Sequence, residues 1–347
     1  MHAQLNVGGV SDQQLICYRE GRATVPYFPN IMNIETTNVC NLSCRICPGR
    51  DEAHQGFLDF DFFHERILPE LSNCPVPRFW LHFNGEPLLH PRINEFISCL
   101  TGRGYFARLS TNGLPLVPKV IDGLITSRLD QVVVSIDSTS SETYRSIRGS
   151  TKFGRLIENI HALIEAKERA GSTLPSVQVQ MVRWSCNDDE VLDFVNFWGR
   201  EGVDSIYLKP LSSRRGTLTL ALAPEESPYL NAFGLDRSPC FYLWDSVVIR
   251  WDGRVVPCCA DLTGQIALGD LKAQTLWEIW NDSPLQNLRR EQYARRFSGA
   301  CAGCQEWANE TGFPGKQPMT LSVGQDEEIM AARGNHVFLS PNLGGRR

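Results

Sequence analysis

The sequence predicts an α/β fold: an open, partial (β/α)6 barrel of the TIM-barrel type, followed by a small domain built from a β-hairpin and helices. Three observations lead to this prediction. Short β-rich runs alternate with segments of helical period through residues 29–212, as in βαβ units with a parallel sheet. Segments containing Cys, Asn and Gly follow the ends of these runs, where barrels of this kind carry their chemistry. From Ser238 onward the pattern changes to two β-rich runs followed by helical segments.

The individual elements follow from the periodicity of apolar residues along the chain. Six runs are predicted to be the strands of the barrel: Ile31–Thr36, Arg78–Phe83, Phe106–Thr111, Gln131–Ile136, Val177–Val182 and Ser205–Leu208. Four segments between them are predicted to be helices: Phe62–Leu71, Ile93–Leu100, Phe153–Arg169 and Glu190–Arg200. In the second domain, Asp252-Gly253 predicts a hairpin turn. Helical patterns then cover Thr275–Trp280 and Leu285–Arg295.

We expect these elements to divide the chain into five parts. They are a polar N-terminal extension (1–28), the barrel (29–212), a linker (213–237), the second domain (238–310) and a C-terminal tail (311–347). Gly, Pro and charged residues are mixed in the tail, and that composition is typical of loosely ordered chain ends.

Composition and charge narrow the function classes. Lys and Arg number 34 against 39 Asp and Glu, for a net charge of −5, whereas a nucleic-acid-binding surface would make the chain markedly basic. A small molecule or a peptide is therefore the expected partner. The chain has no apolar run of the roughly 18 residues needed to span a membrane, and no signal-peptide pattern, so we expect a cytoplasmic protein. In that compartment, twelve cysteines indicate metal ligands or reactive thiols before disulfides.

The stretch CNLSCRIC carries three of these cysteines, Cys40, Cys44 and Cys47, directly after the first predicted strand. Thiolates three and four residues apart in a short loop can converge on one soft metal centre. A structural zinc ion or a fully protein-bound cluster needs four ligands, so three thiolates leave one metal position open for another molecule. The alternatives are three packed thiols or part of a zinc site that residues elsewhere complete.

The Cys40-x3-Cys44-x2-Cys47 spacing resembles the signature of the radical S-adenosylmethionine (SAM) enzymes. The resemblance implies that the three thiolates hold a [4Fe–4S] cluster whose open iron binds SAM. It also implies that one electron, from a reducing partner of the flavodoxin or ferredoxin type, cleaves SAM to methionine and a 5′-deoxyadenosyl radical. That radical abstracts a hydrogen atom from the substrate. Ile46 stands at the position that usually contacts adenine in this family.

The stretch NGEP, Asn84 to Pro87, extends the resemblance, because it is similar to the family's Gly-Gly-Glu-Pro motif after the second strand. Asn84 takes the place of the first glycine. The resemblance implies that Gly85 lets the backbone approach the methionine part of SAM closely. It implies that Glu86 pairs with the ammonium group of SAM.

Four further residues at later strand ends resemble SAM-binding positions of the family: Asn112, Ser135, Asp137 and Arg148. Asn112 and Ser135 resemble residues that hydrogen-bond the ribose and the carboxylate of SAM, with Asp137 close by. Arg148 resembles an arginine that pairs with the carboxylate. Each of these short motifs also occurs in ordinary turns, but their order along successive strands supports the resemblance over residues 30 to 210.

A second set of four cysteines has the spacing C-x17-C-x42-C-x2-C: Cys240, Cys258, Cys301 and Cys304. On chemistry alone, four thiolates suit either a zinc ion or an iron–sulfur cluster. The set resembles the twitch domain, the shortened form of the SPASM extension, and that resemblance implies an auxiliary [4Fe–4S] cluster. Gly253 precedes Cys258 by five positions, as in the family pattern, and we take Cys258 rather than Cys259 as the ligand.

Two residues near the predicted site are candidates for catalysis. Cys186 follows the fifth strand and could return a hydrogen atom to a substrate radical, or be a packed thiol beside Trp184. His82 shares a strand face with Asn84, so it could reach the site, although a structural histidine is the alternative.

The resemblance leaves several reactions open. The first hypothesis is epimerisation or dehydrogenation of a sugar, aminocyclitol or nucleoside in antibiotic biosynthesis, with decarboxylation of a sugar-acid nucleoside as a variant. The second is a maturase that modifies a ribosomally made peptide or a protein side chain. The third, from a different class, is a non-catalytic zinc or iron–sulfur module.

Overall fold

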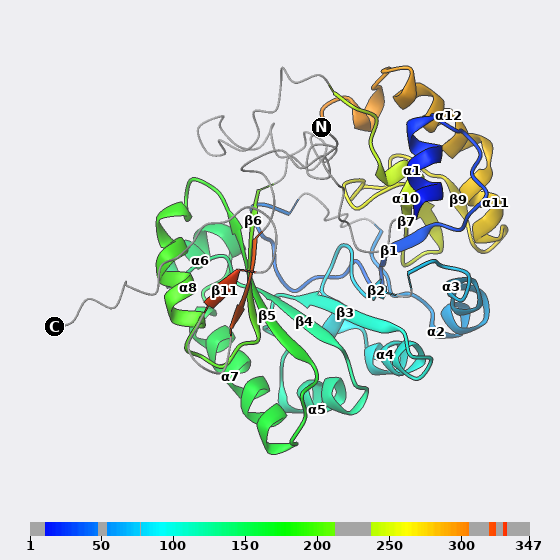
Figure 1. Cartoon of the computed structure of the whole chain (residues 1–347). Helices are drawn as coiled ribbons and strands as arrows, with labels where there is room; N and C mark the ends of the chain where they lie inside the picture. The colour runs from blue at the N-terminus through cyan, green and yellow to red at the C-terminus, as the bar shows by residue number, and fades with distance from the viewer. Residues whose placement is uncertain are drawn as a thin grey trace.

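This computed structural model describes residues 11–47, 54–76, 78–211, 237–304, 319–323 and 329–331 (Figure 1). The six predicted barrel strands are confirmed, and each is hydrogen-bonded in parallel to the next: β1 (Asn30–Ile34), β2 (Arg78–Trp80), β3 (Phe106–Thr111), β4 (Gln131–Ser135), β5 (Ser176–Arg183) and β6 (Ser205–Pro210). The mixed α/β fold with a parallel sheet, as in a partial barrel, is therefore confirmed.

Helices connect these strands, and the four predicted ones are present. The predicted helices correspond to α2 (Phe60–Phe62) with the π-helical turn Phe63–Ile67 and α3 (Leu68–Leu71), then α4 (Ile93–Thr101), α7 (Phe153–Arg169) and α8 (Val191–Trp198). Short 3-10 helices cover Pro87–Leu89 and Asp188–Glu190. The sequence prediction omitted α5 (Pro118–Thr126) and α6 (Ser141–Arg148), which are short. Capping defines α6, because the Ser140 side chain accepts from Thr143 N and Gly149 ends the helix at φ 67°.

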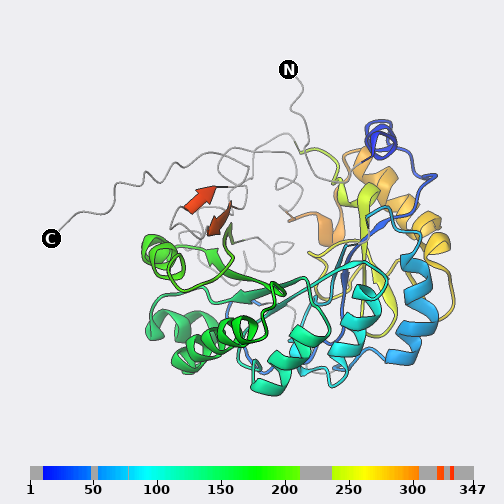
Figure 2. The same ribbon diagram turned by 60° about the horizontal axis from the view of Figure 1, so that its bottom comes forward.

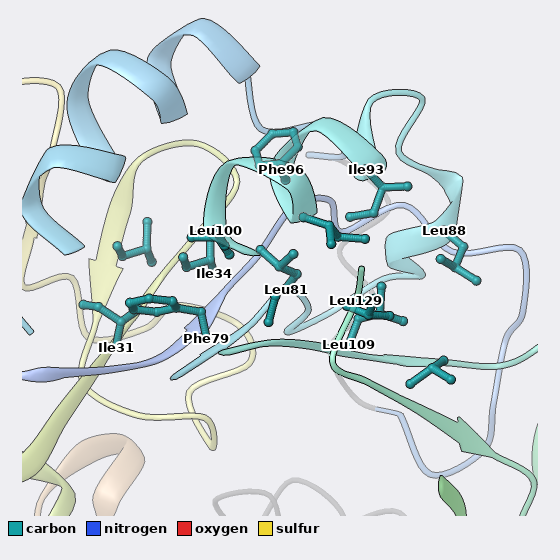
Figure 3. Close-up of a cluster of buried hydrophobic side chains, with 14 of the residues drawn as sticks. Ile31, Ile34, Phe79, Leu81, Leu88, Ile93, Phe96, Leu100, Leu109 and Leu129 are labelled. Atoms are coloured by element: carbon teal, nitrogen blue, oxygen red, sulfur yellow. The ribbon is translucent and has the colours of Figure 1, made fainter. Parts of the chain in front are cut away.

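One face of the parallel sheet packs against the helices to form the core. Phe79, Leu81 and Leu109 lie on that face, together with Phe96 and Leu100 of α4 (Figure 3). Helices α4, α5 and α7 lie on this outer side of β3, β4 and β5 (Figure 1). Because side chains alternate along a strand, the residues between the core positions point to the inner side of the barrel.

The second domain continues the same sheet. Strand β7 (Ser246–Ile249) pairs in parallel with β1, and β8 (Arg254–Val256) and β9 (Gly269–Asp270) follow in antiparallel order. The predicted hairpin turn at Asp252-Gly253 is confirmed, with Gly253 at φ 91°. The C-terminal strands therefore join the barrel edge at β1, a pairing the sequence did not indicate.

Helices α10 (Tyr242–Asp245), α11 (Leu276–Asn281) and α12 (Ser283–Tyr293) and a 3-10 turn (Gly299–Cys301) complete this domain. The two helical patterns predicted there are confirmed. Helix α1 (Asp12–Arg19) lies in the segment expected to be a polar extension, and both views place it beside α10 (Figures 1 and 2). Its Tyr18 ring meets Trp244 edge-on at 5.4 Å, and its hydroxyl donates to Pro239 O at 2.8 Å.

At the other edge of the sheet, β10 (Met319–Val323) pairs antiparallel with β6, and β11 (Ile329–Ala331) pairs with β10. Both strands fall in the segment expected to be a loosely ordered tail, so part of that segment belongs to the sheet. The expected linker lies outside the described residues except for Arg237. In the part of the chain that the structure describes, no helix has the length and apolar character to cross a membrane.

Candidate active site

The three-cysteine loop leaves the end of β1 and is anchored on two neighbouring elements. Arg45 N donates to Ile147 O at 2.8 Å, which fixes the loop to α6. The Arg45 guanidinium lies 5.3 Å from the centre of the Trp184 ring, after β5. The Ile46 side chain packs against the small buried cluster that contains Trp184. The loop is thus held from the side of α6 and β5, and its three thiols lie at the carboxyl end of the sheet.

The thiols fit an anionic cluster. Cys40 and Cys44 are half-buried and Cys47 is exposed. Burial raises the pKa of Cys40 to about 11, so metal binding there must displace a proton. Arg148 Nη1 donates to Cys44 Sγ at 3.7 Å, a contact that would stabilise a thiolate. Among the described residues, no three His, Cys, Asp or Glu side chains are close enough to hold a single metal ion, and the ligands of a four-iron cluster bind separate irons.

The chain returns from this loop along a hydrogen-bonded path. Thr37 Oγ1 donates to Gly56 O at 2.7 Å. The Asn38 side chain accepts from Gly56 N at 2.9 Å and donates to His54 O at 2.7 Å. The His90 ring bonds to Leu58 O at 3.0 Å through Nε2. These bonds position both ends of the loop, and the sequence reasoning had singled out none of these residues.

The NGEP turn packs directly on the backbone that precedes Cys40. Gly85 has φ 71°, and a Cβ there would lie 2.6 Å from Thr37 O and 2.7 Å from the carbonyl carbon of Asn38. Only glycine fits such a close approach. Glu86 N donates to Val39 O at 2.8 Å, which completes the contact. Gly85 therefore brings the Glu86 side chain beside the cysteine loop.

Glu86 is a buried carboxylate that accepts three hydrogen bonds. Thr111 Oγ1 and Asn112 N each donate to it at 2.7 Å, and Leu88 N donates at 3.2 Å. Burial raises the pKa of Glu86 to about 7, against the effect of these bonds. The group formed by Glu86, Thr111 and Asn112 is called the Glu86 cradle below. A carboxylate with this pKa can accept a cation at neutral pH.

Asn84, where the family pattern has glycine, links the barrel to the second domain. Its Nδ2 donates to Leu262 O at 2.8 Å, and its N donates to Glu35 Oε1 at 3.2 Å. Glu35 is fully buried and also accepts from Arg250 Nε at 3.5 Å and Trp251 N at 3.2 Å. Burial raises the pKa of Glu35 and Arg250 opposes that shift. This Glu35–Arg250 joint between β1 and β7 was not foreseen from the sequence.

The structure brings the other predicted SAM-binding residues to the same edge. Asn112 Nδ2 donates to Asn41 Oδ1 of the cysteine loop at 2.7 Å. The Ser135 hydroxyl bonds to Ser110 Oγ at 3.2 Å, farther along the inner side. Arg148 Nη2 pairs with the buried Asp137 Oδ2 at 2.6 Å. Burial alone would lower the pKa of Arg148, but the Asp137 carboxylate raises it.

The two catalytic candidates lie in different surroundings. His82 is on the inner side of the sheet, where its Nδ1 accepts from Ser110 N at 3.1 Å and its ring meets Trp80 at 4.8 Å. Cys186 is exposed on the turn after Trp184. The buried Asn187 fixes this turn, because its Nδ2 donates to Asp137 O at 2.8 Å and to Val182 O at 3.0 Å. Asn187 is thus a supporting residue that the sequence reasoning missed.

The second cysteine set is assembled from separate segments, and its four members are half-buried: Cys240, Cys258, Cys301 and Cys304. Cys240 N donates to Gln292 Oε1 of α12 at 3.2 Å, and Cys304 N donates to Cys301 O at 3.2 Å. Burial is the main cause of the raised pKa of Tyr207 in β6, and the nearby Cys259 adds to that rise. The choice of Cys258 rather than Cys259 as the ligand stays a prediction.

Comparison with known proteins agrees with this geometry. The family description "Radical SAM superfamily" matches residues 34–197, and "Iron-sulfur cluster-binding domain" (SPASM) matches residues 240–305. The tungsten-containing aldehyde ferredoxin oxidoreductase cofactor-modifying protein of Pyrococcus furiosus is 26% identical over 71% of this chain and 79% of its own length. The PqqA peptide cyclase of Gluconobacter oxydans is 24% identical over 86% of this chain and 89% of its own length.

Solved structures share the fold. Streptococcus suis SuiB bound to the precursor peptide SuiA has a TM-score of 0.60 and 16% identity, covering 79% of this chain and 69% of SuiB. BtrN in complex with AdoMet and 2-DOIA has a TM-score of 0.52 and 17% identity, covering 80% of this chain and 92% of BtrN. Residues 34–197 therefore form a radical SAM domain and residues 240–305 a SPASM domain, and the cofactors that these domains imply are a [4Fe–4S] cluster, SAM and auxiliary iron–sulfur.

Proposed function

We propose that this enzyme abstracts a hydrogen atom from a carbon of a polar substrate bound on the inner side of the barrel. The observation that carries the proposal is the Glu86 cradle, which lies beside the three-cysteine loop at the carboxyl end of β2 and β3. When bound, the cluster and SAM supply a 5′-deoxyadenosyl radical. A reducing partner of the flavodoxin or ferredoxin type would provide the electron.

The residues of the site have distinct proposed roles. Cys40, Cys44 and Cys47 would hold the cluster. Glu86 would bind the ammonium of SAM, because its carboxylate is buried beside the loop and has a pKa near neutrality. Ile46 would pack against adenine.

Three further residues would bind the rest of SAM. Asn112 and Ser135 would hydrogen-bond the ribose and carboxylate. Arg148, kept charged by Asp137, would face the carboxylate and stabilise the Cys44 thiolate.

A small polar substrate, of the sugar, aminocyclitol or nucleoside type, suits the inner side of the sheet. Ser110, Ser135 and Gln180 form a hydrogen-bonded row there, with bonds of 3.2 Å. Such hydroxyl and amide groups match a substrate rich in hydroxyls. The reaction would be an epimerisation or a dehydrogenation. In the epimerisation, Cys186 would give a hydrogen atom to the substrate radical, and one electron from the reducing partner with one proton would restore the thiol. In the dehydrogenation, the substrate radical would lose one proton to solvent and one electron, which the auxiliary cluster would accept.

A second candidate is the modification of a ribosomally made peptide. It is favoured by the length of the match to the PqqA peptide cyclase, which extends over 86% of this chain. A peptide would also offer polar side chains to the inner side of the barrel.

One experiment separates the two candidates. The reconstituted enzyme, with SAM and a chemical reductant, is given fractions of a deuterated cell extract, divided into small molecules and peptides. Mass spectrometry then measures deuterium in the 5′-deoxyadenosine formed. Deuterium from the small-molecule fraction supports the first candidate, and deuterium from the peptide fraction alone supports the second. Deuterium from neither fraction would contradict both.

Once one fraction of the extract is found to contain a substrate, the Cys186→Ala variant tests how the substrate radical reacts further. If Cys186 is the hydrogen donor, the variant should convert a redox-neutral reaction into net oxidation. An unchanged product at an unchanged rate would exclude that role.

A further inference from the structure

Six side chains that the proposed SAM site does not use occupy the inner side of β2, β3 and β6. They alternate with the core residues of each strand: Trp80, His82, Arg108, Ser110, Tyr207 and Lys209. All six are half-buried, so each retains accessible surface. The set includes two cationic side chains and no acidic one.

Arg108 is the residue of this set whose surroundings best suit a ligand. Its Nε is buried without a hydrogen-bond partner, and within the described ranges its guanidinium makes neither a hydrogen bond nor an ion pair. Three other arginines with little exposure are paired: Arg148 with Asp137, Arg250 with Glu35, and Arg289 with the carbonyl groups of Leu243, Ala23 and Trp280. A buried cation normally has an anionic or carbonyl partner, because desolvation is costly otherwise.

The Trp80 ring orients this cation. The guanidinium carbon of Arg108 lies 3.4 Å from the centre of the Trp80 ring. A guanidinium over an aromatic face keeps its N–H donors at its edge, where they can bind a carboxylate or phosphate with two parallel hydrogen bonds. Burial lowers the pKa of Arg108 to about 9, so the group remains charged at neutral pH.

The neighbours of Arg108 also suit an anion. Burial raises the pKa of Tyr207, and the nearby Arg108 charge opposes that rise. The Tyr207 hydroxyl therefore lies close enough to Arg108 to offer a second donor. Lys209 follows two residues later on the same side of β6, with Nζ 6.0 Å from the centre of the Tyr207 ring. Arg108 precedes Asn112 by four residues, a distance of about 13 Å along an extended strand, which leaves room for a substrate between them.

We propose that Arg108, stacked on Trp80 and flanked by Tyr207 and Lys209, binds a carboxylate or phosphate group of the substrate. The enzyme would then select anionic substrates, with the reacting carbon held between this anchor and the SAM site. This inference rests on the proposed function, because it assigns the part of the substrate that lies farthest from SAM.

The test compares Arg108→Gln with Arg78→Gln in the reconstituted, SAM-loaded enzyme. Arg78 is the matched control, because it has the same charge and lies on the same side of β2, but is exposed. Calorimetry measures the binding of pyrophosphate, of citrate and of neutral inositol. The unaltered enzyme and Arg78→Gln should bind one of the two anions but not inositol, and Arg108→Gln should bind that anion at least about tenfold more weakly.

The anion that binds identifies the group, since pyrophosphate represents a phosphate substrate and citrate a carboxylate one. Arg108→Lys keeps the charge but loses the paired donors, so it should also bind the anion more weakly than the unaltered enzyme. If Arg108→Gln does not fold, Arg108→Lys replaces it in the test. Equal binding by the unaltered enzyme and both Arg108 variants, or no anion binding by the unaltered enzyme, would overturn the inference.

Reductive cleavage of SAM, measured as 5′-deoxyadenosine without substrate, separates this inference from the proposed function. It should be the same in Arg108→Gln and the unaltered enzyme, because Arg108 makes no hydrogen bond to the cysteine loop or to the Glu86 cradle. If SAM is cleaved but no anion binds, only the inference fails. If the unaltered enzyme does not cleave SAM, the proposed function itself fails.

Discussion

The two cysteine sites of this enzyme are built in different ways. The first takes three thiols from eight consecutive residues after β1, and its supports are the ends of neighbouring strands and α6. The second takes thiols from separate segments between residues 240 and 304, and one of its supports is α12, whose Gln292 side chain accepts from Cys240 N. The comparison shows that a short loop carries its own ligand spacing, whereas a dispersed set depends on how several elements pack.

The largest effects are expected when one thiol is removed from each site, because the two variants should lose different functions. Cys44→Ala should abolish cleavage of SAM, because the first cluster loses one of its three protein ligands. Cys301→Ala should retain SAM cleavage without substrate and lose only the auxiliary iron. Iron and zinc analysis should give about eight irons per chain for the unaltered enzyme and about four for Cys301→Ala. About four irons with one zinc in the unaltered enzyme would instead make the second site structural.

Breaking the Glu35–Arg250 joint should have the next largest effect. Arg250→Met leaves the Glu35 carboxylate buried without its cationic partner, which should lower the free energy of unfolding by about 3–5 kcal/mol. Chemical denaturation measures this loss. The control is Arg92→Met, which removes an exposed ion pair with Glu95 and should lower the free energy of unfolding much less. Similar losses in both variants would show that the joint does not hold the two domains together.

A methyl group at Gly85 should disturb the first site more selectively. Gly85→Ala combines a left-handed backbone with a clash against Thr37 and Asn38, for a loss of about 2–4 kcal/mol. Gly104→Ala is the matched control, because Gly104 has φ 75° and no atom within 4 Å of an added Cβ, so only the backbone cost of about 1–2 kcal/mol remains. Weaker SAM binding in Gly85→Ala but not in Gly104→Ala would place the effect at the NGEP turn. Equal losses would mean that the turn can move away.

The difference between features that lie within one short segment and contacts that join distant segments also explains what the sequence could predict. The six barrel strands were identified because they are short β-rich runs that alternate with helical segments, and CNLSCRIC was identified because its three cysteines lie within eight consecutive residues. The pairing of β7 with β1 is not encoded in either segment alone. The Glu35–Arg250 contact joins residues 215 positions apart, so no local pattern indicates it.

Other features were missed for related reasons. Helix α1 has a polar sequence and is stabilised by its packing on α10, so its pattern resembled an extension. Asn84 stands where the family motif has glycine, and the motif gives no sign that its side chain reaches Leu262 in the other domain. The stacking of Arg108 on Trp80 depends on the register of β2 and β3, which a single sequence does not give.

The smallest expected effect is a pH dependence of the free energy of unfolding that comes from His90, whose ring contacts Leu58 after the first cysteine loop. Burial lowers the pKa of His90 from 6.5, and its ring accepts from Arg92 N while it bonds to Leu58 O, an arrangement that requires the neutral form. The unfolded chain therefore binds a proton below about pH 6.5 that the folded chain does not, so the free energy of unfolding should fall as pH drops below that value. His90→Gln should remove this part of the pH dependence in denaturation measured from about pH 7 to 5.5. If the unaltered enzyme and the variant keep the same pH slope in that range, the packing of His90 on Leu58 and Arg92 does not depend on its neutral form.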